Sequence, residues 1–269
     1  MPLDESRCIL CSKQQSNAWG VWEGACFYFD KEKVEQAAGS GLKPLWFSFE
    51  DSKNCKVVVP AGCSLGLFQS DFSECILKQD ACLFHQSLGC DCEQTFVLES
   101  GAQLTHCRQD FYRPFNGVSS VHVLLKEPGA RVDWQEGYWL ESNTHAKVQL
   151  RVVHQAPKTY SRCSLKSVLK DQAQGSFRID TTIEKAATQS QADQHILNYV
   201  LSKTARVVNQ PQLHIYNKHV QANHGCATQP LPENVLLYMQ TRGIPFVEAQ
   251  RLFLDSFLKT THEAMNCYV

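Results

Sequence analysis

The 269-residue sequence has almost no net charge and no long apolar run, and each absence excludes a class of protein. Its 26 Lys and Arg residues nearly balance 27 Asp and Glu residues, so nothing favours binding to nucleic acid. No apolar run approaches the roughly 18 residues that a membrane helix requires. The first residues, MPLDESRCILCSK, lack the charged-then-apolar order of a signal peptide. We therefore expect a cytoplasmic protein that contacts neither nucleic acid nor membrane.

The sequence also lacks motifs of nucleotide-binding and metallohydrolase sites. It contains no GxxxxGK[ST], no HExxH and no GxGxxG that opens a helix. A convergent pair of carboxylates, which a β-helix enzyme acting on polysaccharides would use, cannot be picked out. We therefore expect no catalytic residues and no tightly bound cofactor.

Cysteine, by contrast, is abundant, with thirteen residues. The number is odd and no export signal is visible, so we expect a reducing compartment and mostly reduced thiols rather than a disulfide framework. Most cysteines are expected to pack as small apolar residues. Cys8 and Cys11 form a CxxC pair, but no second pair with zinc-site spacing accompanies it.

A second concentration of soft-metal ligands occupies one stretch of the chain. It contains Cys82, His85, Cys90, Cys92, His106 and Cys107. Neighbouring residues of a strand point to opposite faces, so these side chains cannot all converge. We interpret the stretch as accidental clustering in a cysteine-rich chain.

From about residue 44 the sequence consists of short β-type runs separated by polar turns. Runs such as TFVLESGAQLTHC and THAKVQLRVVH alternate apolar and polar residues, which is the period of a half-buried strand. An alanine in a turn, with an apolar residue two positions later, recurs at Ala102/Leu104, Ala130/Val132, Ala146/Val148 and Ala205/Val207. Such units predict a stacked β architecture, and periodicity alone leaves both a parallel β-helix and a β-sandwich open.

The last forty residues have a helical pattern. We divide the chain into an N-terminal segment (1–50), a β core (51–229) and a C-terminal helical subdomain (230–269). A helix is predicted over 232–242, stopped by Gly243, and Pro245 opens a second helix. In the second helix Phe246, Ala249, Phe253 and Phe257 form one apolar stripe, which must dock on the chain's own body or on a partner.

Residues 205–257 contain a long ordered motif: A-R-V, then P-Q-L-x-I-Y, V-x-x-x-H-G, a tyrosine-containing helix and T-R-G-I. Its residues are Ala205, Arg206, Val207, Pro211, Gln212, Leu213, Ile215, Tyr216, Val220, His224, Gly225, Tyr238, Thr241, Arg242, Gly243 and Ile244. An upstream block adds Val152, His154, Ser161, Arg162, Lys166, Leu169 and Phe177. This order resembles the SufB/SufD family of the SUF iron–sulfur cluster assembly system. The His224–Gly225 pair is similar to the SufD branch, although Ala222 replaces its usual cysteine and Cys226 follows instead.

The resemblance implies a right-handed parallel β-helix with a small C-terminal α-helical subdomain. It also implies a scaffold that pairs with a SufB-like protein or with a second copy, and that binds a SufC-like ATPase through its C-terminal helices. The contacts expected for that ATPase are Tyr238, Arg242, Phe246, Phe253 and Phe257. A non-catalytic role follows, because the ATPase supplies the turnover.

His224 is expected in a turn where the β body ends, and the resemblance implies that it is a ligand for transient iron or an iron–sulfur cluster at the subunit interface. Cys226 is a second candidate ligand, because thiolate and imidazole both suit iron. Two alternatives stay open: a degenerate bracing subunit that binds no iron, and a β-helix enzyme that acts on polysaccharides.

Overall fold

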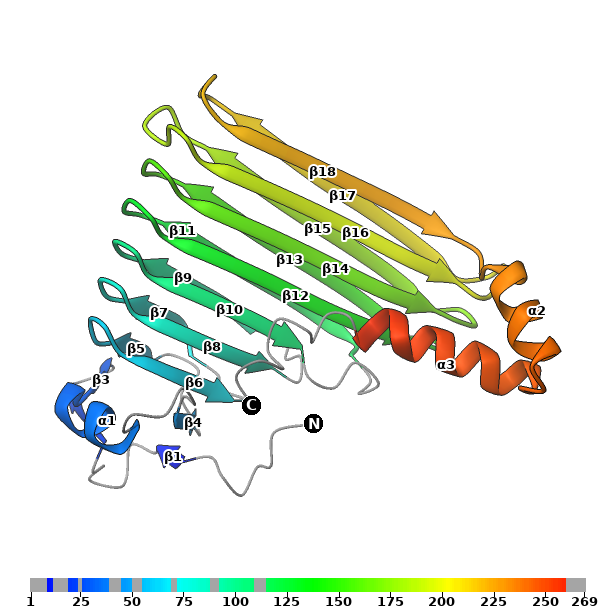
Figure 1. The fold of residues 1–269 in the computed structure, drawn as a ribbon, viewed down its shortest axis with the longest axis horizontal. Helices are drawn as coiled ribbons and strands as arrows, with labels where there is room; N and C mark the ends of the chain where they lie inside the picture. The colour runs from blue at the N-terminus through cyan, green and yellow to red at the C-terminus, as the bar shows by residue number, and fades with distance from the viewer. Residues whose placement is uncertain are drawn as a thin grey trace.

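Two nine-stranded sheets form the body of the protein, and the chain passes from one sheet to the other at almost every strand (Figure 1). The computed structural model describes residues 9–11, 19–23, 26–38, 45–49, 55–68, 72–87, 92–108 and 115–259. Sheet A consists, in spatial order, of β1 (Ile9–Cys11), β4 (Leu45–Phe49), β6 (Ser64–Phe68), β8 (Cys82–Ser87), β10 (Gln103–Arg108), β12 (Arg131–Leu140), β14 (Tyr160–Leu169), β16 (Gln191–Val200) and β18 (Gln221–Gln229). Sheet B consists of β17 (Arg206–Ile215), β15 (Gln174–Ile183), β13 (His145–His154), β11 (Gly117–Leu125), β9 (Cys92–Leu98), β7 (Glu74–Leu77), β5 (Lys56–Val59), β3 (Cys26–Phe29) and β2 (Gly20–Glu23).

Neighbouring strands are parallel throughout the described residues, except for the antiparallel pair β2 and β3. Each coil therefore contributes one strand to each sheet and returns one position further along. This is a parallel β-solenoid, which confirms the predicted fold class, and the antiparallel sheets of the alternative β-sandwich are excluded.

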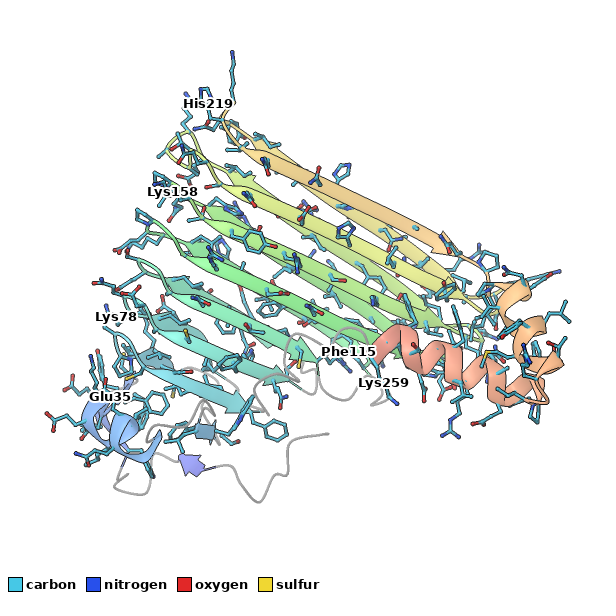
Figure 2. All side chains as sticks on the ribbon, viewed as in Figure 1. Glu35, Lys78, Phe115, Lys158, His219 and Lys259 are labelled. Atoms are coloured by element: carbon cyan, nitrogen blue, oxygen red, sulfur yellow. The ribbon has the colours of Figure 1, made fainter. Side chains whose placement is uncertain are left out.

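The coils turn at residues with left-handed backbone conformations. At several turns such a residue is followed directly by a small buried one: Gly62–Cys63, Asp80–Ala81, Gly101–Ala102, Gly129–Ala130, Lys158–Thr159 and Gln189–Ser190. At Gly101 a Cβ atom would clash with the side-chain carboxylate of Asp80 in the neighbouring turn, and the φ of 67° itself favours glycine. Lys78, Lys158 and His219 mark this edge of the solenoid in Figure 2. Of the alanines in the sequence pattern, Ala102 and Ala130 directly follow such turn residues, whereas Ala146 lies within β13 and Ala205 directly precedes β17.

Alternate residues of each strand fill the space between the two sheets. In β15 every second residue from Gly175 to Ile183 is buried, and the parallel register stacks these residues into rows that run along the solenoid. Burying a large apolar side chain contributes about 1.5–3 kcal/mol, so these rows supply most of the stabilisation.

Three helices accompany the strands: α1 (Lys31–Ala38), α2 (Glu233–Thr241) and α3 (Phe246–Lys259). Gly243 has a φ of 85° and ends the predicted first helix of the tail, because this conformation favours glycine. Helix α3 packs against the outer face of sheet A, where Leu254 and Leu258 meet Val168 of β14. Among the described helices, none combines the length and apolar character needed to cross a bilayer.

Candidate functional site

The last coil of the solenoid leaves its inward-facing side chains uncovered. Strands β17 and β18 end their sheets, and within the described part of the chain no further strand lies beyond them (Figure 1). We call this surface the open end. Its inward-facing residues, assigned from the register with buried residues of β15 and β16, are Val207, Asn209, Pro211, Leu213, Ile215, Ala222, His224, Cys226 and Thr228.

His224 and Cys226 lie on the same face of β18, two residues apart. His224 aligns with Gln194 and Cys226 with Ile196, and both residues of β16 are fully buried. His224 and Cys226 therefore continue two interior rows of the solenoid, yet both are exposed because their coil is the last. An imidazole and a thiol are thus exposed on the same face of one strand.

The expectation that His224 lies in a turn is wrong. The ladder between β16 and β18 runs without a break from Gln221 to Gln229, and His224 is within it. The neighbouring glycine favours a turn in a sequence-based interpretation, but here it faces outward. A Cβ atom on Gly225 would come within 2.9 Å of the His195 ring, so the glycine makes room for that histidine.

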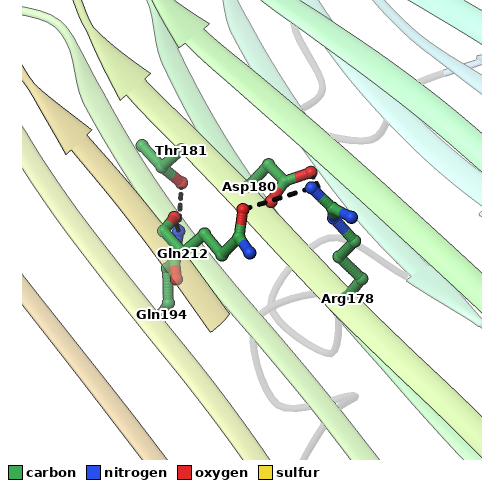
Figure 3. Close-up of polar contacts among 5 residues, drawn as sticks. All are labelled: Arg178, Asp180, Thr181, Gln194 and Gln212. Carbon is green, nitrogen blue, oxygen red and sulfur yellow. Dashed lines mark hydrogen bonds and ion pairs between the residues drawn. The ribbon is translucent and has the colours of Figure 1, made fainter. Parts of the chain in front are cut away.

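The interior directly below the open end is polar. Gln194 Nε2 donates to Thr181 Oγ1 at 2.5 Å and to the main-chain carbonyl of Gln212 at 3.1 Å, and Figure 3 shows the amide directed at Thr181. Gln194 Oε1 is buried and has no hydrogen-bond partner. On the outer face of sheet B, Arg178 holds both Asp180 (2.6 Å) and the Gln212 side chain (3.1 Å). Gln212 is therefore held on both faces of sheet B, because its main-chain carbonyl accepts from Gln194 and its side-chain oxygen accepts from Arg178.

The two predicted ligands do not complete a metal site by themselves. Across the described ranges, no group of three His, Cys, Asp or Glu residues is arranged to hold a metal ion. Structural zinc sites, for comparison, use four ligands. The remaining ligands for a metal at the open end would come from another chain or from the metal's own partners, such as sulfide.

The five predicted partner-binding residues do not share one surface. Tyr238 and Phe246 are 59% and 48% exposed, and the Arg242 guanidinium lies 5.3 Å from the Tyr238 ring centre. Phe253 and Phe257 are instead half-buried against Tyr199 of β16, with ring centroids 5.3 and 4.8 Å apart. Part of the apolar stripe of α3 therefore docks on the chain's own body.

Two further apolar residues of the tail were not among the expected contacts. Leu237 on α2 and Val247 at the start of α3 are 62% and 75% exposed. Together with Tyr238, Arg242 and Phe246 they form what we call the outer helical surface.

The cysteine- and histidine-rich stretch contains one real cluster. His85 and His106 lie opposite each other in neighbouring strands and are buried, with their Nδ1 atoms 2.9 Å apart. His106 Nε2 lies 3.2 Å from Glu136 Oε1, and the Tyr138 hydroxyl donates to the other oxygen of Glu136 at 2.8 Å. Cys107 points to the opposite face, as the alternation argument predicts. The cluster was not predicted, because the alternation of residues along a strand does not show which inward-facing residues of different strands become neighbours.

Burial and hydrogen bonding set the protonation of this cluster. Desolvation lowers the pKa values of His85 and His106, so both rings are neutral near neutral pH. Desolvation raises the pKa of Glu136, but hydrogen bonds from His106 and Tyr138 and the charge of Arg108 outweigh it, and the net pKa is lowered. All four groups are enclosed in the core, which suits a structural network rather than an accessible site.

The other cysteine motifs stay untested. Cys8 and Cys90 lie outside the described residues, and only the backbone is described for Cys11 and Cys92. None of the cysteine side chains that are described takes part in a disulfide.

A further pattern, Gly62-Cys63-Ser64-Leu65-Gly66, has the GxSxG spacing of a hydrolase nucleophile. Here it leads from a turn into strand β6, whereas a nucleophile elbow leads from a strand into a helix. The pattern therefore does not form that active-site geometry.

The fold and the open end together define a class: a parallel β-solenoid with a C-terminal helical pair and exposed His and Cys side chains on its last strand. Residues 68–257 match the family model of the SUF system FeS cluster assembly SufBD core domain. The chain therefore belongs to the SufBD family, as its C-terminal motif predicts.

Individual relatives are similar in sequence to this chain over shorter stretches. A Synechocystis iron–sulfur cluster assembly SufBD family protein is 29% identical over 116 residues, covering 43% of this chain and 25% of that protein. The chloroplastic protein ABCI7 of Arabidopsis thaliana is 30% identical over 142 residues, 52% of this chain and 30% of the relative. The iron–sulfur cluster assembly protein SufD of Escherichia coli is 26% identical over 105 residues, 39% of this chain and 25% of the relative. The chain thus spans under a third of the length of these relatives.

Proposed function

We propose that this chain is a scaffold subunit for iron–sulfur cluster assembly in a reducing cytoplasm. It pairs through its open end and offers His224 and Cys226 as ligands for iron or a nascent cluster. The observation that carries the proposal is the exposure of these two side chains on one face of the last, uncapped strand. Nothing in this role requires the chain itself to turn over a substrate.

The open end has the features of a surface that pairs with another chain. The last strand of each sheet has one hydrogen-bonded neighbour, and unpaired strand edges invite pairing with another chain. Apolar side chains such as Ile215 are exposed beside them. The partner is a SufB-like protein or a second copy of this chain, and its contact would bring further ligands to His224 and Cys226.

Recruitment of a SufC-like ATPase is assigned to the outer helical surface. This surface exposes Tyr238, Phe246 and Val247. Val247 lines a pocket with Leu254 and with Leu201 of the body, so the surface borders the contact of α3 with sheet A. Clustered aromatic and arginine side chains are the residues that most often anchor protein interfaces. Phe253 and Phe257 hold α3, and with it this surface, on the body through their ring contacts with Tyr199.

The chemistry of the site suits iron. Imidazole and thiolate both bind iron, and iron delivered here would be cargo for assembly. An exposed Cys226 can supply the thiolate, whereas a core cysteine such as Cys163 cannot reach the surface.

Co-expression with a SufB-like protein and a SufC-like ATPase tests the proposal. Affinity purification with mass measurement identifies the partners, and iron and sulfide are then assayed for the wild type, His224→Ala and Cys226→Ser. Both variants should assemble normally and lose iron. His219→Ala is the matched control, because His219 is exposed in the turn before β18 and lies outside the inward-facing set.

Two results would contradict parts of the proposal. Full iron loading in His224→Ala, with the complex intact, would favour the alternative of a bracing subunit that binds no iron. A chain that remains alone in the presence of all the partners would contradict the scaffold role itself.

A further inference from the structure

We propose that Gln194 is a positioning residue for His224. In this structure Gln194 Oε1 has no hydrogen-bond partner. The proposed bond forms when the exposed His224 side chain turns so that one ring nitrogen donates to Oε1, which directs the other, unprotonated ring nitrogen toward the metal at the open end. The inference rests on the proposed function of His224 as a ligand. Gln194 is on the strand below and touches no cargo itself.

The first support is the register. Gln194 and His224 are paired residues of β16 and β18 and belong to the same inward-facing row. Neighbouring strands are about 4.8 Å apart, so paired side chains on one face lie side by side. Gln194 is fully buried and His224 is its neighbour on the open side.

The second support is the orientation of the Gln194 amide. A main-chain carbonyl can only accept, so the contact with Gln212 O identifies the atom facing it as the NH₂ group. Thr181 Oγ1 accepts from the same group (Figure 3), so the two contacts together anchor the amide at two points. Flipping the amide would set Oε1 against the Gln212 carbonyl, so Oε1 must point elsewhere.

The third support is the state of Oε1. This atom is buried and has no partner, and an unsatisfied buried acceptor costs about 1–3 kcal/mol. Two inward neighbours flank Gln194 in its row: Cys163 on the core side and His224 on the open side. A thiol is a weak donor, whereas a ring N–H is a good one. His224 is thus the better donor for this acceptor.

The expected consequence is a defined tautomer. A histidine that donates one N–H to a carbonyl keeps its other nitrogen unprotonated and fixed in direction, as metal-binding histidines generally do. Cys226 lies two residues further on the same face of β18 and can bind the same metal ion. Gln194 would thus prepare an exposed histidine for binding without adding a ligand.

The test uses the full-length chain and two buried amides of the same strand. Gln194→Met keeps the size of the side chain and removes the acceptor. Asn198→Leu is the matched control, because Asn198 is also buried but pairs with Thr228 rather than with His224. The readouts are the ¹⁵N-edited signal of the His224 ring N–H and the affinity for Co²⁺ alone.

In the wild type and in Asn198→Leu we expect a slowly exchanging His224 ring N–H and one dominant tautomer. In Gln194→Met this signal should disappear, and Co²⁺ affinity should fall about 10–100-fold, the usual effect of losing an outer hydrogen bond to a ligand. If Gln194→Met does not fold, Gln194→Asn serves instead, because its shorter amide cannot both keep the anchor and reach His224.

An unchanged ring N–H signal and unchanged Co²⁺ affinity in Gln194→Met would overturn the inference. His224→Ala separates this failure from failure of the proposed function. If His224→Ala loses Co²⁺ while Gln194→Met retains it, only the positioning role is wrong. If His224→Ala also retains Co²⁺, His224 is not a ligand, and the positioning role of Gln194 is then wrong as well.

Discussion

The ring of Tyr199 on β16 meets the ring of Phe257 on α3 edge-on, with centroids 4.8 Å apart. This contact ties the C-terminal helix to the solenoid, and it is extended by the Lys166 Nζ, which donates to the Phe257 carbonyl at 3.1 Å. The helix that we assign to partner recruitment is therefore positioned by strands of the body.

Phe257→Ala should loosen this attachment. Replacing a fully buried Phe by Ala costs about 3–5 kcal/mol, and for this half-buried ring we expect a loss of about 2 kcal/mol in the free energy of unfolding. Urea unfolding measures it, and limited proteolysis should show earlier cleavage within α3. Leu237→Ala is the control, expected within about 0.5 kcal/mol of wild type because Leu237 is exposed. Equal effects of the two changes would contradict the docking.

The outer helical surface should bind the ATPase without contributing to the fold. The double change Tyr238→Ala and Phe246→Ala removes two exposed rings, so the melting temperature should change little. Co-purification of a SufC-like ATPase should be lost. Retention of the ATPase by this variant would place its contact on another part of the chain.

Acid should destabilise the protein through His154. This buried ring is hydrogen-bonded to Thr159 Oγ1 and Ser161 Oγ at 2.8 and 2.9 Å, and burial lowers its pKa from 6.5 to about 4. The neutral ring is favoured in the fold, so between pH 6.5 and 4 the unfolded chain binds more protons. The free energy of unfolding should therefore fall as the pH decreases through this window, by about 3 kcal/mol for this residue.

Urea unfolding at stepped pH values between 4 and 7 measures this loss. His154→Asn should reduce the slope over that window, although it lowers stability at neutral pH. A remaining slope is expected from His85 and His106, whose pKa values burial also lowers. A slope that is the same in the wild type and in His154→Asn would show that His154 titrates as an exposed residue does.

The thiols should differ widely in reactivity. Cys226 is exposed, whereas Cys75 and Cys163 are fully buried and burial raises both of their pKa values. Alkylation of the native protein, followed by peptide mass mapping, should modify Cys226 first and the other two only on unfolding. Thiol counting under denaturing, anaerobic conditions should find few disulfides, and several native bridges would contradict the reducing compartment.

Several features were readable from residue order alone because they depend on local chemistry. Alternation identified strands, small and polar residues indicated turns between them, and Gly243 and Pro245 separated two helices within a residue or two of where they lie. The ordered motif around His224 identified the family, which the match over 68–257 supports.

What alternation does establish is parity, meaning which residues of a strand face inward. Alternation predicted that the clustered Cys and His side chains of residues 82–107 cannot all converge, but it could not make His85 a neighbour of His106 or Gln194 a neighbour of His224. Those pairings depend on register, which is set by the length and turn geometry of each whole coil. Sequence separations of 21 and 30 residues carry no local signal of that kind.

The tertiary structure alone decided which side of α3 is free. Its apolar residues surround much of the helix, so the sequence made docking on the body the default expectation and left docking on a partner as the alternative. Tyr199 and Val168 offer an apolar outer surface on sheet A, and burying Phe257 and Leu258 there removes apolar area from water. Val247 lies beside that contact, where it lines a pocket with Leu201, and it remains 75% exposed.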